Sequence, residues 1–209
     1  MKTMKERPII FSAESVKQIL SGTKTQTRRV VKPQLYGWEP YKQPEWYTSS
    51  AIDKDGMLVP GKEVFGVYSE DGECSRVCPY GAPGDRLWAR EAFFHYESGA
   101  DSDTSESVLF YKDTIPPEWE NVKWRSPLFL PRRHSRLTLE ITNVRCEQLQ
   151  DISDADAVAE GFATPPYHQR KARFAIAWDS LNAKRGFDWC MNPYVWVLEF
   201  KKVESERNE

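Results

Sequence analysis

The segment from Gly22 to Arg29 is the densest group of chemically useful side chains in the sequence. It holds one lysine, three threonines and two arginines, with no acid among them. In a pocket with cationic neighbours, Lys24 would have a lowered pKa through lost hydration and like-charge repulsion, and could take a proton from a hydroxyl. The same cations could instead bind phosphate, or the segment could be a polar, solvent-exposed strand. Residue types alone leave these three interpretations open.

Two glutamates could contribute to a site or be purely structural. Glu160 stands immediately before Gly161, at the expected end of a short helix, where spacing alone indicates an ordinary surface residue. Glu91 lies near the end of a strand that is expected to be buried. A buried carboxylate requires a partner, which Arg90 or an arginine elsewhere in the chain could supply.

A second basic cluster spans residues 131–136, and Trp124 and Phe129 precede it. Basic groups interleaved with aromatic rings suit single-stranded nucleic acid or a nucleoside phosphate. The alternative is a loop that only solubilises the end of a strand. The sequence has no glycine-rich phosphate loop, serine elbow or histidine-pair metal motif.

The four cysteines are Cys74, Cys78, Cys146 and Cys190. Cys74 and Cys78 have a spacing found in zinc sites, but no second pair follows them. We therefore predict free thiols, with no metal and no organic cofactor.

The elements that must position these residues are strands and a few helices. Alternation of apolar and polar residues, clearest in the third segment, predicts strands in one sheet: Thr25–Arg29, Arg86–Ala92, Ser135–Val144 and Tyr194–Lys201. Helices are expected at Ala13–Ser21, Asp154–Glu160 and Arg173–Leu181, and a short strand at Arg7–Phe11. Without regular βαβ alternation, this order predicts an α+β fold with a mainly antiparallel, barrel-like sheet and flanking helices.

One domain is expected over residues 1–209, with insertions at about 33–80 and 97–123. The first is rich in Pro, Gly, Tyr and Trp, and we predict an irregular segment with one hairpin near Met57–Tyr68. The second begins with an acidic stretch, Glu97–Ser107, that is expected to be a solvated loop.

The charge balance limits the classes of partner. With 29 basic and 31 acidic residues, the net charge is -2, which argues against nonspecific coating of nucleic acid but permits a local basic patch. The N-terminal residues 1–11 are interrupted by charges, and no apolar run reaches the roughly 18 residues of a membrane span. We therefore expect a cytoplasmic protein without a membrane partner.

Four separated blocks, in order, resemble the ASCH family of the PUA-like superfamily: Ile19–Arg29, Pro83–Glu91, Leu149–Gly161 and Asn192–Phe200. The first resembles that family's Gly-x-Lys-Thr-x-Thr-x-Arg motif. The resemblance implies a small curled antiparallel β-barrel with helices at its rim, facing a cleft. It is nearest to the larger ASCH proteins of phages and prophages.

The resemblance also implies an activity, because one bacterial member is an amidohydrolase that removes the acetyl group of N4-acetylcytidine. Its lysine, threonine and glutamate fall at Lys24, Thr27 and Glu160, and its supporting arginine at Arg29. Neutral Lys24 would take the Thr27 proton, and Glu160 would carry a proton to the leaving amine.

Other ASCH proteins imply an RNA- or modified-base-binding module, or an endoribonuclease that uses the same lysine. The residues expected to contact substrate or nucleic acid are Arg28, Arg29, Glu91, Arg132 and Arg136. Hydrolysis requires Lys24, Thr27 and Glu160 to lie within hydrogen-bond reach of one another, and it requires Lys24 to be at least partly buried. Binding requires neither Thr27 nor Glu160 at the site.

Overall fold

The structure is a computed structural model that describes residues 3–97, 107–112, 114, 122–163 and 169–203. Its central sheet has five strands in the order β1-β6-β9-β10-β2. Their bounds are β1 Glu6–Ile10, β2 Gln26–Val30, β6 Arg86–Arg90, β9 Thr138–Gln148 and β10 Tyr194–Val203. The β1–β6 pair is parallel and the other three pairs are antiparallel. The prediction that four of these strands share one mainly antiparallel sheet is confirmed.

The sheet is bent but open. The register between β9 and β10 shifts between Glu199 and Phe200, and such a bulge increases the local bend and twist. Within the described residues, β1 and β2 are its edge strands and no ladder joins them. The fold is thus a mixed α and β structure in which strands dominate, and closure into a barrel stays a prediction.

Strand β10 is buried on both faces and divides the core into two parts. Trp196, Leu198 and Phe200 belong to the larger apolar cluster, which also includes side chains of β1, β9 and the first helix. Val195 and Val197 belong to a smaller cluster beneath the C-terminal helices. This division follows from the period-two alternation of side chains along a strand.

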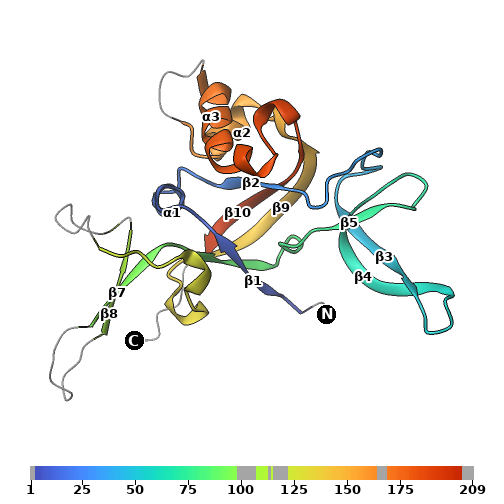
Figure 1. Cartoon of the computed structure of the whole chain (residues 1–209), viewed down its shortest axis with the longest axis horizontal. Helices are drawn as coiled ribbons and strands as arrows, with labels where there is room; N and C mark the ends of the chain where they lie inside the picture. The colour runs from blue at the N-terminus through green and yellow to red at the C-terminus, as the bar shows by residue number, and fades with distance from the viewer. Residues whose placement is uncertain (1–2, 98–106, 113, 115–121, 164–168, 204–209) are drawn as a thin grey trace.

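Among the described residues, the α-helices are α1 Ala13–Leu20, α2 Asp154–Ala159 and α3 Arg170–Asn182. Ser12 caps α1, and Ser153 with Asp156 forms the predicted capping box of α2. Figure 1 shows α2 and α3 together beside β2, β9 and β10. Short 3-10 helices are η2 Pro127–Phe129, η3 Arg132–His134, η4 Leu149–Asp151, η6 Ala183–Arg185 and η7 Trp189–Met191. Among the helices described, none has the length and apolar character needed to cross a membrane.

The segment 33–80 is not irregular, so that prediction is wrong. It contains a three-stranded antiparallel sheet of β3 Glu45–Ile52, β4 Leu58–Tyr68 and β5 Ser75–Val77, which stands apart from the central sheet in Figure 1. Pro60 and Gly61, two of the residues that made this segment look irregular, lie where the β3–β4 register shifts. Aromatic pairs between β3 and β4, such as Trp46 with Phe65 at 5.5 Å between ring centroids, supply the cross-strand contacts.

The second insertion begins as a hairpin of β7 Phe93–Glu97 and β8 Ser107–Tyr111. The acidic loop predicted at Glu97–Ser107 lies for the most part outside the described residues, as do residues 113 and 115–121 of this insertion.

Candidate functional site

The loop that carries Lys24 is fixed between two helices. The backbone amides of Thr23 and Lys24 both donate to the Gln18 carbonyl oxygen on α1, at 2.9 and 3.1 Å. The next amide, that of Thr25, donates to the Ala159 carbonyl at the end of α2, at 2.9 Å. These bonds bring Lys24 to the C-terminal end of α2, although the two segments are far apart in sequence.

Lys24 and Glu160 form a buried pair. The Lys24 Nζ donates to Glu160 Oε2 at 2.7 Å and to the Glu160 carbonyl oxygen at 2.8 Å. The two side chains are only 6% and 4% exposed. The prediction that Lys24 is buried is confirmed, and Glu160 is not the ordinary surface glutamate that its spacing indicates.

The close approach of α1 to the end of α2 depends on Gly161. Its φ of +101° is unfavourable for residues with a side chain, and an added Cβ would lie 2.4 Å from Gln18 Oε1. Gln18 also donates from Nε2 to the Gly161 carbonyl at 3.3 Å. Glycine at this position therefore allows Glu160 to face the Lys24 loop.

Burial lowers the pKa of Lys24 from its ordinary value. The charge and hydrogen bond of Glu160 oppose this shift, whereas the like charges of Arg29 and Arg28 add to it. The net direction is the one a lysine base requires, because a lower pKa increases the neutral fraction near pH 7.

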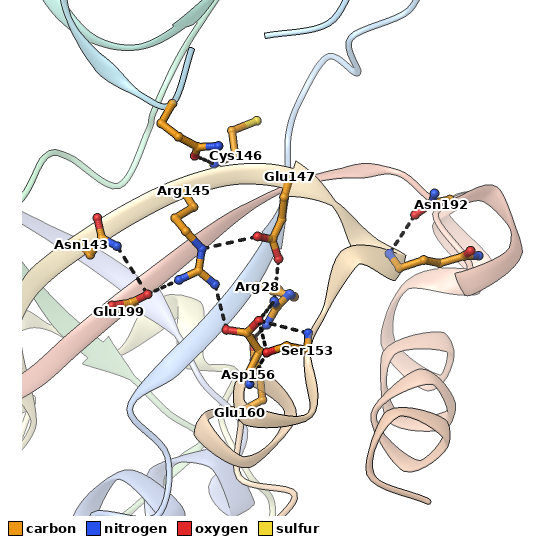
Figure 2. Close-up of polar contacts among 12 residues, drawn as sticks. Arg28, Asn143, Arg145, Cys146, Glu147, Ser153, Asp156, Glu160, Asn192 and Glu199 are labelled. Atoms are coloured by element: carbon orange, nitrogen blue, oxygen red, sulfur yellow. Dashed lines mark hydrogen bonds and ion pairs between the residues drawn. The ribbon is translucent and has the colours of Figure 1, made fainter. Parts of the chain in front are cut away.

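Arg28 is the second cation on Glu160, and its side chain is 1% exposed. Figure 2 shows it among three carboxylates from β9 and α2. Its Nη1 lies 3.3 Å from Glu160 Oε1, and its Nη2 lies 2.6 Å from Glu147 Oε1 and 3.3 Å from Asp156 Oδ2. Arg28 was expected to contact substrate or nucleic acid, whereas in this structure its guanidinium is buried and paired with carboxylates.

Arg145 extends the network on the other side of Asp156. It donates from Nη2 to Asp156 Oδ1 at 2.8 Å and contacts Glu147 and Glu199 (Figure 2). Burial tends to raise the pKa of Asp156, but hydrogen bonds from Ser153 and the charges of the two arginines hold it well below its usual value. The network, Lys24 included, joins three cations to four carboxylates: Lys24, Arg28, Arg145, Glu147, Asp156, Glu160 and Glu199.

Thr27 is not joined to this pair. Successive side chains of β2 point to opposite faces, and Arg28 faces α3, where its guanidinium lies 5.8 Å from the Phe174 ring centre. Arg29 lies instead over Phe11 and donates to the Ile10 carbonyl at 2.6 Å. Thr27 shares that second face and is 5% exposed. In the part of the chain that the structure covers, no hydrogen bond links Thr27 to Lys24 or Glu160.

Glu160 nevertheless acts on both faces of β2. Burial lowers the pKa of Arg29, and Tyr80 and Glu160 oppose that shift, so the Glu160 carboxylate is within electrostatic range of Arg29 while it contacts Arg28. Thr27 immediately precedes these two arginines in sequence.

The remaining predicted contacts are ion pairs away from Lys24. Glu91 is 1% exposed and accepts two bonds from Arg136, from Nε at 2.9 Å and from Nη2 at 2.7 Å. Its predicted need for an arginine partner is confirmed. Its role in binding a ligand stays a prediction, and in this structure the carboxylate is enclosed and paired. Arg136 is engaged by the same pair, and Arg132, which is partly exposed, pairs with Glu6 at 3.0 Å.

Four network members were not anticipated as site residues: Arg145, Glu147, Asp156 and Glu199. Arg145 and Glu147 are two residues apart on β9 and so share one face of the strand. Asp156 was recognised only as a capping residue. A signal did exist for the first two, since oppositely charged residues two apart at the end of a core strand indicate a polar contact on that face.

The cysteines are free thiols. Burial raises the pKa of Cys78 to about 11 and that of Cys146 to about 12. Across the residues that the structure describes, no group of three or more His, Cys, Asp or Glu side chains is arranged to hold a metal ion.

A hollow of about 630 Å³ lies beside the insertion sheet and is separate from the predicted site residues. Its lining combines aromatic and acidic side chains from two loops: Trp38, Glu39, Pro40, Tyr41, Ser69, Glu70 and Asp71.

Comparisons with known protein families, with curated proteins and with solved structures find no match to this chain.

Proposed function

We propose that this chain is an ASCH-type protein of the PUA-like superfamily that hydrolyses the acyl amide of a modified pyrimidine nucleoside, with N4-acetylcytidine as the substrate. The observation that carries the proposal is the buried Lys24–Glu160 pair, with 2.7 Å between Nζ and Oε2. These residues are 136 positions apart in the chain, and they are two of the three that the ASCH resemblance selects.

A buried ion pair is weak evidence of a stabilising role, because the cost of desolvating two charges offsets much of their attraction. Perturbed ionisable groups are, however, characteristic of sites that transfer protons. Lys24 and Glu160 share a short hydrogen bond, and burial lowers the pKa of Lys24. The pair can therefore exchange a proton internally, as general acid–base catalysis requires.

In the proposed reaction, neutral Lys24 takes the hydroxyl proton of Thr27, and the Thr27 oxygen attacks the acetyl carbonyl carbon. The bond between that carbon and N4 then breaks, and Glu160 passes the proton from Lys24 to N4, which releases cytidine. Glu160 then takes a proton from water, and the resulting hydroxide attacks the acetyl ester on Thr27. The bond between the acetyl carbon and the Thr27 oxygen breaks, Glu160 returns its proton to that oxygen, and acetate leaves with its remaining proton passing to solvent. Arg29 is the side chain proposed to stabilise the oxyanion.

This sequence of steps requires the Thr27 hydroxyl to turn toward the pair when substrate binds. Side chains move readily between staggered rotamers, and catalytic hydrogen bonds commonly form only in the substrate complex.

The test is turnover of N4-acetylcytidine by the purified chain, followed by mass spectrometry of cytidine and acetate. Lys24→Gln, Thr27→Ala and Glu160→Gln should each remove most of the activity. Thr25→Ala, which changes an exposed threonine two positions from Thr27, should retain it and is the matched control.

Turnover that survives Thr27→Ala would exclude Thr27 as the nucleophile. Absence of turnover in the wild-type chain would refute the hydrolase proposal and favour a module that binds RNA or a modified base. Binding of N4-acetylcytidine and of a structured RNA, measured on the same preparation, distinguishes these outcomes.

A further inference from the structure

Arg28 occupies a central place in the ionic network for a residue that cannot reach a ligand. Its side chain is 1% exposed, yet it contacts Glu147 on β9, Asp156 within α2 and Glu160 at the end of α2. One guanidinium thus serves three carboxylates, and one of these is the acid–base glutamate of the proposed reaction.

We infer that Arg28 is a positioning residue, which holds Glu160 Oε1 so that Oε2 faces the Lys24 ammonium. The inference rests on the proposed hydrolase function and assigns Arg28 a role within that same site. Arg28 acts through Glu160 and touches neither substrate nor the reacting atoms.

The two oxygens of Glu160 have different partners. Oε1 lies 3.3 Å from Arg28 Nη1, and Oε2 lies 2.7 Å from Lys24 Nζ. The terminal torsion of a glutamate is broad and roughly two-fold, so a single partner would leave the carboxylate free to turn. A cation on each oxygen fixes the plane of the carboxylate and directs one oxygen at the lysine.

The position of the Arg28 side chain is fixed by carboxylates other than Glu160. Its Nη2 lies 2.6 Å from Glu147 and 3.3 Å from Asp156. Asp156 is held by the capping box with Ser153 and by Arg145 at 2.8 Å. A continuous set of contacts therefore runs from the start of α2, through Arg28, to the carboxylate at its end (Figure 2).

Arg28 also affects the charge of Lys24. Burial is the largest cause of the lowered Lys24 pKa, and the like charges of Arg29 and Arg28 on β2 add to it. Glu160 at the end of α2 opposes the shift, and α1 contacts the Lys24 loop through the uncharged Gln18. The repulsion from Arg28 is the smallest of these causes, whereas the charge and hydrogen bond of Glu160 both raise the Lys24 pKa and rank above it. If Arg28 positions Glu160, its loss frees the carboxylate to turn away and should therefore lower the Lys24 pKa further.

The test compares Arg28→Gln and Arg28→Lys with Arg145→Gln as the matched control. Arg145 contacts Glu147 and Asp156 as Arg28 does, but it makes no bond to Glu160. Arg28→Gln should lower kcat on N4-acetylcytidine about a hundredfold, as expected for a misplaced catalytic group, leave KM within about threefold, and move the pH profile to lower pH. Arg28→Lys keeps the charge and should recover the pH profile and part of kcat.

Equal losses in Arg28→Gln and Arg145→Gln, with the pH profile of the wild type, would show a merely structural role and overturn the inference. If Arg28→Gln does not fold, Arg28→Lys provides the test, because lysine keeps the charge but lacks the two Nη atoms that contact Glu160 and Glu147. A kcat equal to that of the wild type in Arg28→Lys would refute the positioning of Glu160 by the guanidinium. Circular dichroism establishes which variants are folded.

A readout without substrate separates this inference from the proposed function. In ¹⁵N-lysine NMR of the full chain, the Lys24 side chain should titrate at lower pH in Arg28→Gln than in the wild type and should be unchanged in Arg145→Gln. If the wild-type chain shows no turnover but the Lys24 titration shifts in Arg28→Gln, the positioning of the Lys24–Glu160 pair by Arg28 is supported and only the proposed hydrolase function is refuted. An unshifted Lys24 titration in Arg28→Gln would overturn the inference whatever the activity.

Discussion

Replacement of Lys24 with methionine removes the charge of the buried pair while nearly preserving side-chain length. Glu160 then loses the 2.7 Å contact to Oε2 and its carbonyl loses a 2.8 Å donor, whereas Arg28 stays 3.3 Å from Oε1. Removal of one partner of a buried pair costs about 3–5 kcal/mol. Because Arg28 remains, we expect the lower end, about 3 kcal/mol, which corresponds to a fall in Tm of roughly 6–12 °C for a chain of this size.

The measurement is urea denaturation followed by circular dichroism and by tryptophan fluorescence. The matched control is Lys201→Met, which breaks the exposed Lys201–Glu140 pair at 2.9 Å, where the lysine side chain is 62% exposed. That change should cost no more than about 1 kcal/mol. The double variant Lys24→Met/Glu160→Gln removes both charges and should lose roughly 1–3 kcal/mol less than the sum of the single losses. A loss in Lys24→Met no larger than that in Lys201→Met would refute the reasoning.

Three further predictions concern backbone strain, pH and thiol reactivity. Gly161→Ala should lower the free energy of unfolding by about 1–3 kcal/mol. The loss should exceed that of the control Gly56→Ala, whose added Cβ meets no atom within 4 Å. Thermal denaturation measures both losses. Because the folded chain lowers the pKa of Lys24, the unfolded chain binds more protons between that lowered pKa and the usual value of about 10.4. The stability of the wild type relative to Lys24→Met should therefore rise with pH across this window in denaturation series, and a flat or falling difference would contradict the pKa direction. A thiol reagent should label exposed Cys190 in the native chain but Cys78 only after unfolding, since burial raises the pKa of Cys78 to about 11; native labelling of Cys78 would count against that burial.

The central sheet could be predicted because its strands carry their pattern locally. In β10, alternate residues from Val195 to Phe200 enter two different apolar clusters, and the run is apolar enough to be recognised without knowledge of its neighbours. The insertion sheet could not be predicted in the same way. Its strands depend on pairing between β3 and β4, and Pro60 with Gly61 masks the pattern at the register shift.

The site shows the same division between local and long-range information. Lys24 and Glu160 could be selected because each lies in a short segment that resembles an ASCH block. The contacts of Arg28 with Glu147 and Glu160 span 119 and 132 residues, and nothing in the residues around Arg28 indicates those partners. Its sequence context instead suggested an exposed cation for phosphate, and only the packing of α2 on β2 corrects that interpretation.

Two buried carboxylates of this chain have cationic partners, and the identity of the cation separates their roles. Glu91 is bound through both oxygens by Arg136, and a guanidinium does not release a proton at any pH that a protein survives. That pair can hold the start of the second insertion against the segment that leads into β9, but it cannot exchange a proton. Glu160 is bound by Lys24, whose ammonium can lose its proton when burial lowers its pKa. Of the two, only the Lys24–Glu160 pair combines burial, a short contact and a labile proton, so the proposed chemistry belongs at the junction of α1, α2 and β2.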